Sequence, residues 1–261
     1  MTESFYNNIA ALKERDEIAI SHRPAHSSST DLNGWIMEHL APRTSDNVLD
    51  IGTGSGKQAL LLARTVKHPG YILSIDRSYE ALYRLSQNSL EAGLETRIRF
   101  LHIPLDELDG HLRRADYDRA VSSRVLSHLR QPRTVFHALA LALKPGGLFF
   151  FYGPSRKNNA EIKRFSARLQ GDFSAQESQE PTFIEGAGVQ GARDVFSQVA
   201  IVKFEQTLRL ASPEMLYACW SASSLYDETL DRPFRQAALR HFESHTVFET
   251  TQRIIGIKAT R

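Results

Sequence analysis

The sequence predicts a doubly wound α/β fold, in which helices cover both faces of a mostly parallel sheet. Short apolar runs alternate with segments of helical spacing over the first part of the chain. A glycine-rich turn, Gly52 to Gly56, joins the first apolar run to the first helical segment, and the second run ends in Asp76. Strands that alternate with helices imply right-handed crossovers and parallel pairing, so the carboxyl ends of the strands converge on one ligand-binding crevice.

The first strand and its turn span Asn47 to Gln58 and read N-V-L-D-I-G-T-G-S-G-K-Q. Glycines are needed where a turn is sharp or where a ligand must approach the backbone closely. A phosphate-binding loop does not fit, because Ile51 stands where its first glycine belongs and Gln58 replaces its hydroxyl residue. A dinucleotide-binding turn is disfavoured, because Lys57 occupies the position of the third glycine. The pattern that remains is D-x-G-x-G-x-G.

The second strand, Tyr71 to Asp76, places a carboxylate at its carboxyl end. There it can accept hydrogen bonds from both ribose hydroxyls of an adenosine that lies across the glycine turn. The next signals are helical spacing that ends at Gly93, and a Lys144 to Gly147 turn that enters an apolar strand. The remaining elements expected in this part are helices at 59–65, 78–92 and 134–143, and strands at 97–103, 117–122 and 148–152.

The segments on either side have less regular patterns. We expect helices at 5–20 and 32–40, the second of them capped by Thr30 or Asp31. After Pro154, a helix is expected to begin at Pro213, because proline is preorganised for the first helical position. The other expectations are a helix at 158–170, a loop or lid at 171–191, a strand at 199–210, a helix at 234–242 and a last strand at 247–259.

Taken together, the motifs resemble those of the class I S-adenosylmethionine-dependent methyltransferases. They are V-L-D-I-G-T-G-S-G, I-D-R-S, Y-D-R-A-V-S-S, L-S-H-L and L-K-P-G-G, in that order between residues 45 and 155. The resemblance implies a Rossmann-like, mostly parallel seven-stranded sheet with a late antiparallel strand and a helical cap. It implies N-terminal helices or a lid at 1–44, a cofactor-binding core at 45–155, and the rest of the sheet with inserted substrate-cap helices at 156–261.

The resemblance also implies S-adenosylmethionine as the cofactor and S-adenosylhomocysteine as the product. For two of the expected cofactor-binding residues a structural role is the alternative. Asp50 would anchor backbone N–H groups of the turn, and Asp76 would be an N-cap of the next helix. Many relatives carry an acidic and then a small residue after the third strand, where this chain has Pro104 and Leu105, so backbone groups or Asp106 would hold the adenine. The residues expected at the cofactor are Asp50, Gly52, Thr53, Gly54, Gly56, Asp76, Arg77, Leu105, Ser122 and Ser123.

Because the cofactor carries the reactive methyl group, the protein has to align the acceptor and exclude water. A base is needed only where the acceptor must lose a proton. The catalytic candidates are His128 and Tyr152, and a surface or capping position is the competing interpretation of His128. For Tyr217, at helical spacing from Trp220, packing competes with ligand binding. The substrate-binding candidates are Tyr6, His22, Arg124 and Tyr217, and no metal is expected, because the histidines are scattered.

The composition of the chain limits the kinds of partner and the cellular compartment that we expect. The net charge is +2 and the basic residues are spread along the chain, which argues against nucleic acid. The single cysteine, Cys219, excludes an internal disulfide and fits a reducing compartment. Neither a membrane-spanning apolar run nor a secretion signal is recognisable. We therefore expect a cytoplasmic monomer or homodimer with a small-molecule substrate and with no nucleic-acid or membrane partner.

Three functions are compatible with these residues. The first is methyl transfer to an oxygen, nitrogen or carbon atom of a small molecule. The second uses S-adenosylmethionine for a non-methyl outcome, namely internal cyclisation or aminobutyl transfer with release of methylthioadenosine. The third is a non-catalytic module that binds S-adenosylmethionine. Asp50, Gly52, Gly54 and Asp76 are all present, which favours retained cofactor binding in each case.

Overall fold

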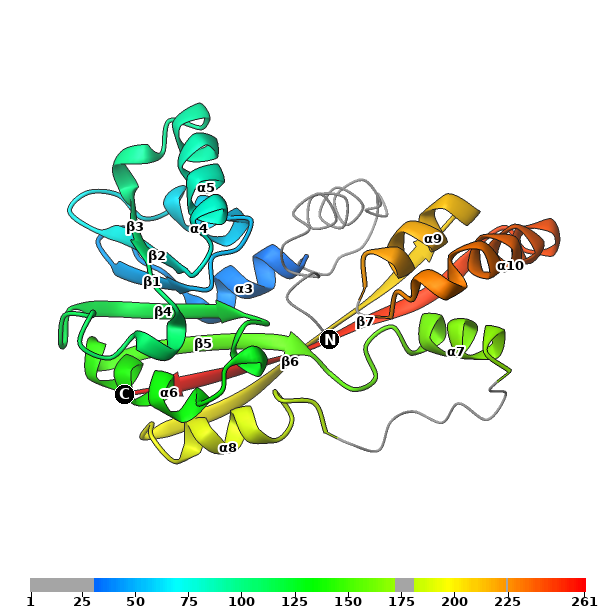
Figure 1. The fold of residues 1–261 in the computed structure, drawn as a ribbon. Helices are drawn as coiled ribbons and strands as arrows, with labels where there is room; N and C mark the ends of the chain where they lie inside the picture. The colour runs from blue at the N-terminus through cyan, green and yellow to red at the C-terminus, as the bar shows by residue number, and fades with distance from the viewer. Residues whose placement is uncertain (1–30, 172–180, 224) are drawn as a thin grey trace. The chain divides into compact units, whose positions relative to one another are not determined.

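The computed structural model describes residues 31–171, 181–223 and 225–261 (Figure 1). The chain divides into two compact units. The core unit comprises Ser29–Ser155, Pro181–Phe204 and Ile254–Arg261, and the helical unit comprises Met1–Ser28, Arg156–Glu180 and Glu205–Arg253. The helix expected at residues 5–20 lies outside the described residues.

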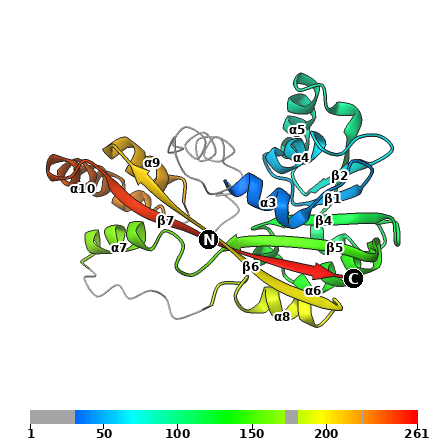
Figure 2. The same ribbon diagram turned by 180° about the vertical axis from the view of Figure 1, so that it is seen from behind.

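A seven-stranded sheet in the order β3-β2-β1-β4-β5-β7-β6 confirms the predicted fold class (Figures 1 and 2). The pairings that join β1 to β2 and β4, β2 to β3, and β4 to β5 are parallel, whereas β7 is antiparallel to β5. The order reverses between β1 and β4, which is where open sheets of this kind bind ligands. The strands are β1 Asn47–Ile51, β2 Tyr71–Asp76, β3 Ile98–His102, β4 Tyr117–Ser123, β5 Leu143–Pro154, β6 Gln198–Leu210 and β7 Phe248–Thr260.

The helices of the core unit cover both faces of the sheet, because successive residues of each strand point to opposite sides. In β5, Phe149 and Phe151 belong to an apolar cluster with α6 and α8, whereas Phe150 and Tyr152 belong to a second cluster with α3 and α4. Figures 1 and 2 show the two groups of helices on opposite sides. The helices of this unit are α3 Leu32–Leu40, α4 Lys57–Ala63, α5 Tyr79–Glu91, α6 Pro132–Ala142 and α8 Ala187–Arg193.

Helix α3 has the predicted bounds, and Asp31 caps it by accepting a hydrogen bond from the backbone N–H of Gly34 at 2.8 Å. Helix α8 corrects a prediction, because its first residues fall in the segment 171–191, which was expected to be a loop or lid. Its glycines are packing positions: a Cβ on Gly188 would lie 2.8 Å from the Phe183 ring, and one on Gly191 would lie 2.6 Å from the Phe136 ring.

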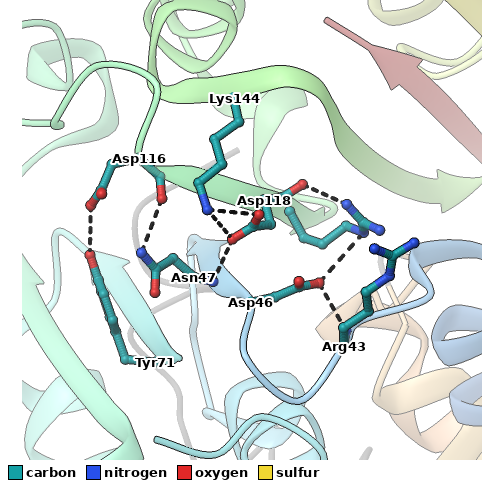
Figure 3. Close-up of polar contacts among 8 residues, drawn as sticks. Arg43, Asp46, Asn47, Tyr71, Asp116, Asp118 and Lys144 are labelled. Atoms are coloured by element: carbon teal, nitrogen blue, oxygen red, sulfur yellow. Dashed lines mark hydrogen bonds and ion pairs between the residues drawn. The ribbon is translucent and has the colours of Figure 1, made fainter. Parts of the chain in front are cut away.

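At the amino-terminal edge of the core sheet, polar groups pair with one another (Figure 3). The Asp118 carboxylate accepts hydrogen bonds from the Asn47 backbone N–H at 2.9 Å and from the Lys144 ammonium at 2.8 Å. The Asn47 amide donates to the Asp116 carbonyl at 3.0 Å, and the Tyr71 hydroxyl donates to the Asp116 carboxylate at 3.1 Å. These bonds fix β1, β2 and β4 against one another and leave the opposite edge for a ligand.

The helical unit has its own apolar core. Trp220 and Phe234 are fully buried and stack at a centroid separation of 4.0 Å. The Tyr217 hydroxyl donates to the Asp231 carboxylate, and the Arg235 guanidinium lies 3.4 Å above the Tyr217 ring. Tyr217 and Trp220 therefore pack within this unit, which is the packing interpretation of their helical spacing. Its helices are α7 Ala160–Leu169, α9 Pro213–Ser221 and α10 Asp231–Ser244. None of the described helices combines the length and apolar character needed to cross a membrane.

Candidate active site

The glycine turn after β1 adopts the left-handed backbone that its sequence predicts. The φ angles are +72° at Gly52, +51° at Gly54 and +77° at Gly56. A Cβ on Gly52 would lie 2.7 Å from the Val125 side chain, and one on Gly56 would lie 2.5 Å from Leu85. A Cβ on Gly54 would meet nothing closer than 4.0 Å. The outer glycines therefore allow close packing, whereas the surface of Gly54 is open to a ligand.

Asp76, at the end of β2, is bonded to this turn. One carboxylate oxygen accepts a hydrogen bond from the Gly54 backbone N–H at 2.9 Å, and the other accepts one from the Ser78 backbone N–H at 2.9 Å. Ser78, rather than Asp76, is the N-cap of α5, because its hydroxyl accepts from the Ala81 N–H. The helix-cap interpretation of Asp76 is therefore wrong. Each carboxylate oxygen keeps a second lone pair for a ligand hydroxyl.

Asp50 lies beneath the turn and is only 3% exposed. Its carboxylate accepts a hydrogen bond from the Thr53 hydroxyl at 2.6 Å, so it anchors the turn through a side chain. Burial raises the pKa of Asp50 to about 7, the Thr53 hydrogen bond opposes this, and the charge of Asp76 adds to it. A cationic ligand group nearby would favour the ionised carboxylate.

The carboxyl ends of β4 and β5 lie at the same edge of the sheet as the glycine turn. The buried Ser122 hydroxyl donates to the Ile51 carbonyl at 3.1 Å and so ties β4 to β1. Tyr152 is buried, and its hydroxyl donates to the Gln58 side-chain carbonyl at 2.8 Å. Ser123 is half-buried beside them. Gln58, in the first turn of α4, was not singled out by sequence reasoning beyond its failure to match a phosphate-binding loop.

Arg124 directly follows β4 and has an unusual backbone. Its φ is +62°, in the left-handed region that few residues with a side chain adopt. Its backbone N–H donates to the Tyr152 carbonyl at 3.1 Å. The Nε atom is buried and has no hydrogen-bond partner, and within the described residues the guanidinium pairs with no carboxylate. Two residues that contact Tyr152 carry further buried donors without a hydrogen-bond partner. They are Nε2 of Gln58, whose side-chain carbonyl accepts from the Tyr152 hydroxyl, and Nε1 of Trp35, whose ring centroid lies 6.2 Å from that of Tyr152.

The remaining predicted residues have no contact with the glycine turn that the structure describes. Arg77 and His128 are exposed, and burial of the imidazole together with the charge of Arg77 lowers the pKa of His128. The catalytic role of His128 stays a prediction. The Leu105 side chain packs into the core. Tyr6 and His22 lie outside the described residues, and Tyr217 belongs to the helical unit. No group of three potential metal ligands occurs in the described part of the chain.

These features lie on a Rossmann-like sheet, and comparison with known proteins identifies the family. A family model described as a methyltransferase domain matches residues 43–207, which is more than half of the chain. The protein therefore belongs to this methyltransferase domain family, as the ordered motifs predicted.

Individual relatives are more distant. A ubiquinone biosynthesis O-methyltransferase of Paracidovorax citrulli is 31% identical over 138 residues, which cover 53% of this chain and 56% of that protein. The match thus spans little more than half of that relative.

Solved structures agree on the fold. A methyltransferase-like protein from Bacillus halodurans superimposes with a TM-score of 0.59 at 14% identity and covers 88% of this chain and 99% of its own. Geranyl diphosphate C-methyltransferase from Streptomyces coelicolor, solved with S-adenosylhomocysteine, gives a TM-score of 0.52 at 12% identity and covers 88% of this chain and 78% of its own. Likeness at this identity concerns the fold alone.

Proposed function

We propose that this protein transfers the methyl group of S-adenosylmethionine to an oxygen, nitrogen or carbon atom of a small-molecule acceptor. The observation that carries the proposal is the arrangement of Gly54 and Asp76. An open, left-handed glycine lies next to a carboxylate that it orients by a hydrogen bond of 2.9 Å. Membership of the methyltransferase domain family supports the reaction class. The O-methyltransferase named among the relatives makes a hydroxyl compound the first acceptor class to test.

The residues present fit S-adenosylmethionine. The space beside Gly54 is open, and a Cβ at this position would occupy it. A glycine therefore lets a ligand approach the backbone closely. Asp76 retains acceptor capacity for two ribose hydroxyls. Asp50 offers a buried carboxylate whose ionised form a cationic ligand would stabilise. Leu105 and the residues that follow β3 would flank the adenine, and Ser122 and Ser123 would line the methionine side.

The cofactor, when bound, supplies a methyl group on a sulfonium. What this chain supplies is position and exclusion of water. The hydrogen bond of 2.8 Å between the Tyr152 hydroxyl and the Gln58 side-chain carbonyl joins the carboxyl end of β5 to the first turn of α4. His128, whose pKa is lowered by burial and by the charge of Arg77, is the candidate to accept a proton where the acceptor must lose one. The acceptor itself enters from the β4 and β5 side of the crevice.

Calorimetric titration with S-adenosylmethionine tests the cofactor proposal. Wild-type protein is expected to bind it, Asp76→Ala to lose binding, and Asp109→Ala, which removes an exposed carboxylate, to bind like wild type. Absence of binding by the wild type, or equal binding by Asp76→Ala, would refute the proposed site.

Chromatography of the cofactor after long incubation without an acceptor distinguishes the reactions. A methyltransferase is expected to leave S-adenosylmethionine intact beyond the uncatalysed rate. Steady release of methylthioadenosine, lost in Asp76→Ala, would instead show that the sulfonium is attacked at another carbon. Transfer is then measured with radiolabelled methyl groups and a panel of phenols, amines and organic acids.

A further inference from the structure

We propose that Arg124 binds a carboxylate of the methyl acceptor, so that the natural substrate is an organic acid. This inference rests on the proposed function and names the substrate class of the same site. Two independent observations carry it: the strained backbone of Arg124 and the unpaired, partly buried guanidinium.

The backbone of Arg124 is held in place by its neighbours. At φ +62° its Cβ is crowded against the peptide, a conformation that glycine would adopt without strain. The Arg124 N–H donates to the Tyr152 carbonyl at 3.1 Å, and the Arg124 carbonyl accepts from the Ser127 hydroxyl at 3.1 Å. Strain that is fixed on both sides in this way is characteristic of residues that present a side chain to a ligand. The strained backbone of Arg124 is therefore fixed by hydrogen bonds on both sides.

The half-buried guanidinium of Arg124 has one buried donor, Nε, that lacks a partner. Arg124 Nε is buried without a hydrogen bond, and no described residue provides a carboxylate to the other nitrogens. A buried charge is stable when it is paired and hydrogen-bonded, and a guanidinium matches the two oxygens of a carboxylate with parallel N–H donors. At the opposite edge of the same sheet, Lys144 has such a partner in Asp118. Among the described residues Arg124 thus has no anionic partner, and we assign that place to a ligand.

The position of Arg124 assigns that partner to the acceptor side. Asp76, the ribose ligand, ends β2, whereas Arg124 follows β4, and β1 lies between these strands. The next residue, Val125, packs against the glycine turn at Gly52. Arg124 is also bonded to Tyr152, around which Gln58 Nε2 and Trp35 Nε1 are further unsatisfied donors. We assign the carboxylate to Arg124, and the unsatisfied donors around Tyr152 are further candidates for polar groups of the acceptor.

A carboxylate has two sources here, because the methionine part of the cofactor also carries one. Two cofactor-derived ligands distinguish the cofactor carboxylate from an acceptor carboxylate. S-adenosylhomocysteine carries the methionine carboxylate, whereas methylthioadenosine lacks it. Loss of the Arg124 charge would weaken only the first of these if the arginine bound the cofactor. It would weaken neither if the arginine bound the acceptor.

The experiment compares Arg124→Met with wild type and with Arg130→Met, which removes an exposed arginine nearby. Protein saturated with S-adenosylhomocysteine is titrated with benzoate and with neutral benzamide, and binding is followed by ligand-observed NMR. We expect saturable benzoate binding to wild type and Arg130→Met, about tenfold weaker binding to Arg124→Met, and weak benzamide binding to all three. The affinity for S-adenosylhomocysteine itself is expected to stay within about twofold in both variants. Arg124→Gly, which suits the left-handed backbone, repeats the test with a variant that retains the fold.

Three results would overturn the proposal. The first is that benzoate does not bind the wild type, and the second is that it binds Arg124→Met as well as wild type. The third is a tenfold loss of S-adenosylhomocysteine affinity with unchanged methylthioadenosine affinity, which would assign Arg124 to the cofactor. Failure of the proposed function has a different signature, because the wild type would then bind no S-adenosylhomocysteine. If the proposed function fails in this way, benzoate binding to wild type and to Arg124→Met is measured without S-adenosylhomocysteine.

Discussion

Individual residues at the two edges of the core sheet are in opposite electrostatic states. At the amino-terminal edge, Asp116, Asp118 and Lys144 are all paired. At the carboxyl-terminal edge, Asp50 is buried away from any described cation, and Arg124 has no described anion. A charged group without a counter-ion is costly when desolvated, so Asp50 and Arg124 mark an edge where a ligand of complementary charge would contribute binding energy.

Asp50 should make the stability of the unliganded protein depend on pH. Its pKa is raised from 3.8 to about 7, so it favours the folded state fully below pH 3.8, and this contribution is lost as pH rises through 7. The total change is at most a few kcal/mol, because one pKa unit corresponds to about 1.4 kcal/mol. Urea unfolding between pH 5.5 and 8.5 should show a decline in wild type that Asp50→Asn lacks. Parallel curves for the two proteins would contradict this explanation.

Gly52 and Gly54 should respond differently to the same substitution. Gly54→Ala places a methyl group in open space, so we expect a stability loss of about 1 kcal/mol from backbone strain and loss of cofactor binding. Gly52→Ala drives the methyl group into Val125 and should cost about 1–3 kcal/mol more. Thermal unfolding and calorimetric titration of both variants measure the two effects. Normal S-adenosylmethionine affinity in a folded Gly54→Ala protein would show that the turn does not contact the ligand.

At the scale of elements, the sequence was most informative where the backbone itself demands particular residues. The turn at Gly52 to Gly56 and the strand end at Asp76 need glycine conformations and a positioned carboxylate, and both are visible in a linear motif. Helix α8 was missed because the Gln, Ser and Glu residues of the segment 171–191 read as a loop, whereas the glycines of α8 allow contact with the rings of Phe183 and Phe136. The Tyr152–Gln58 bond and the strain at Arg124 also depend on residues far apart in sequence.

Helix α8 gives a test of this explanation. Helix propensity alone predicts that Gly191→Ala stabilises the protein by about 1 kcal/mol. The added methyl group would instead lie 2.6 Å from the ring of Phe136, which is fully buried, so we expect destabilisation by about 1–3 kcal/mol. Gly186→Ala is the matched control, since its Cβ would have only ordinary contacts at 3.6 Å or more. Chemical denaturation compares the two variants, and a stabilised Gly191→Ala protein would refute the packing argument.

At the scale of the whole molecule, each unit contains an apolar cluster and one of the two tryptophans. Trp35 lies in the core unit and Trp220 in the helical unit. The helical unit has no signature in the sequence beyond helical spacing, because packing of one aromatic residue on another leaves no fixed motif. Its Trp220–Phe234 stack became apparent only from the structure.

The two tryptophans allow the units to be followed separately. In Trp220→Phe the fluorescence reports the core unit, and in Trp35→Phe it reports the helical unit. A ligand bound to the core unit at about 100 times its dissociation constant stabilises that unit by about 2.7 kcal/mol. We expect S-adenosylhomocysteine to shift the urea midpoint reported by Trp35 more than that reported by Trp220. Equal shifts would show that the two clusters unfold as one cooperative unit.

The place of β7 in the sheet has a consequence for synthesis on the ribosome. It is the last strand in chain order, yet it lies between β5 and β6 and pairs with Phe149, Phe150 and Phe151 of β5. Until residues 248–260 emerge, the growing chain displays that aromatic strand with an unpaired edge, which is the kind of surface that recruits other chains. We therefore expect the yield of folded protein to depend on translation speed and chaperone supply as well as on the stability of the finished fold.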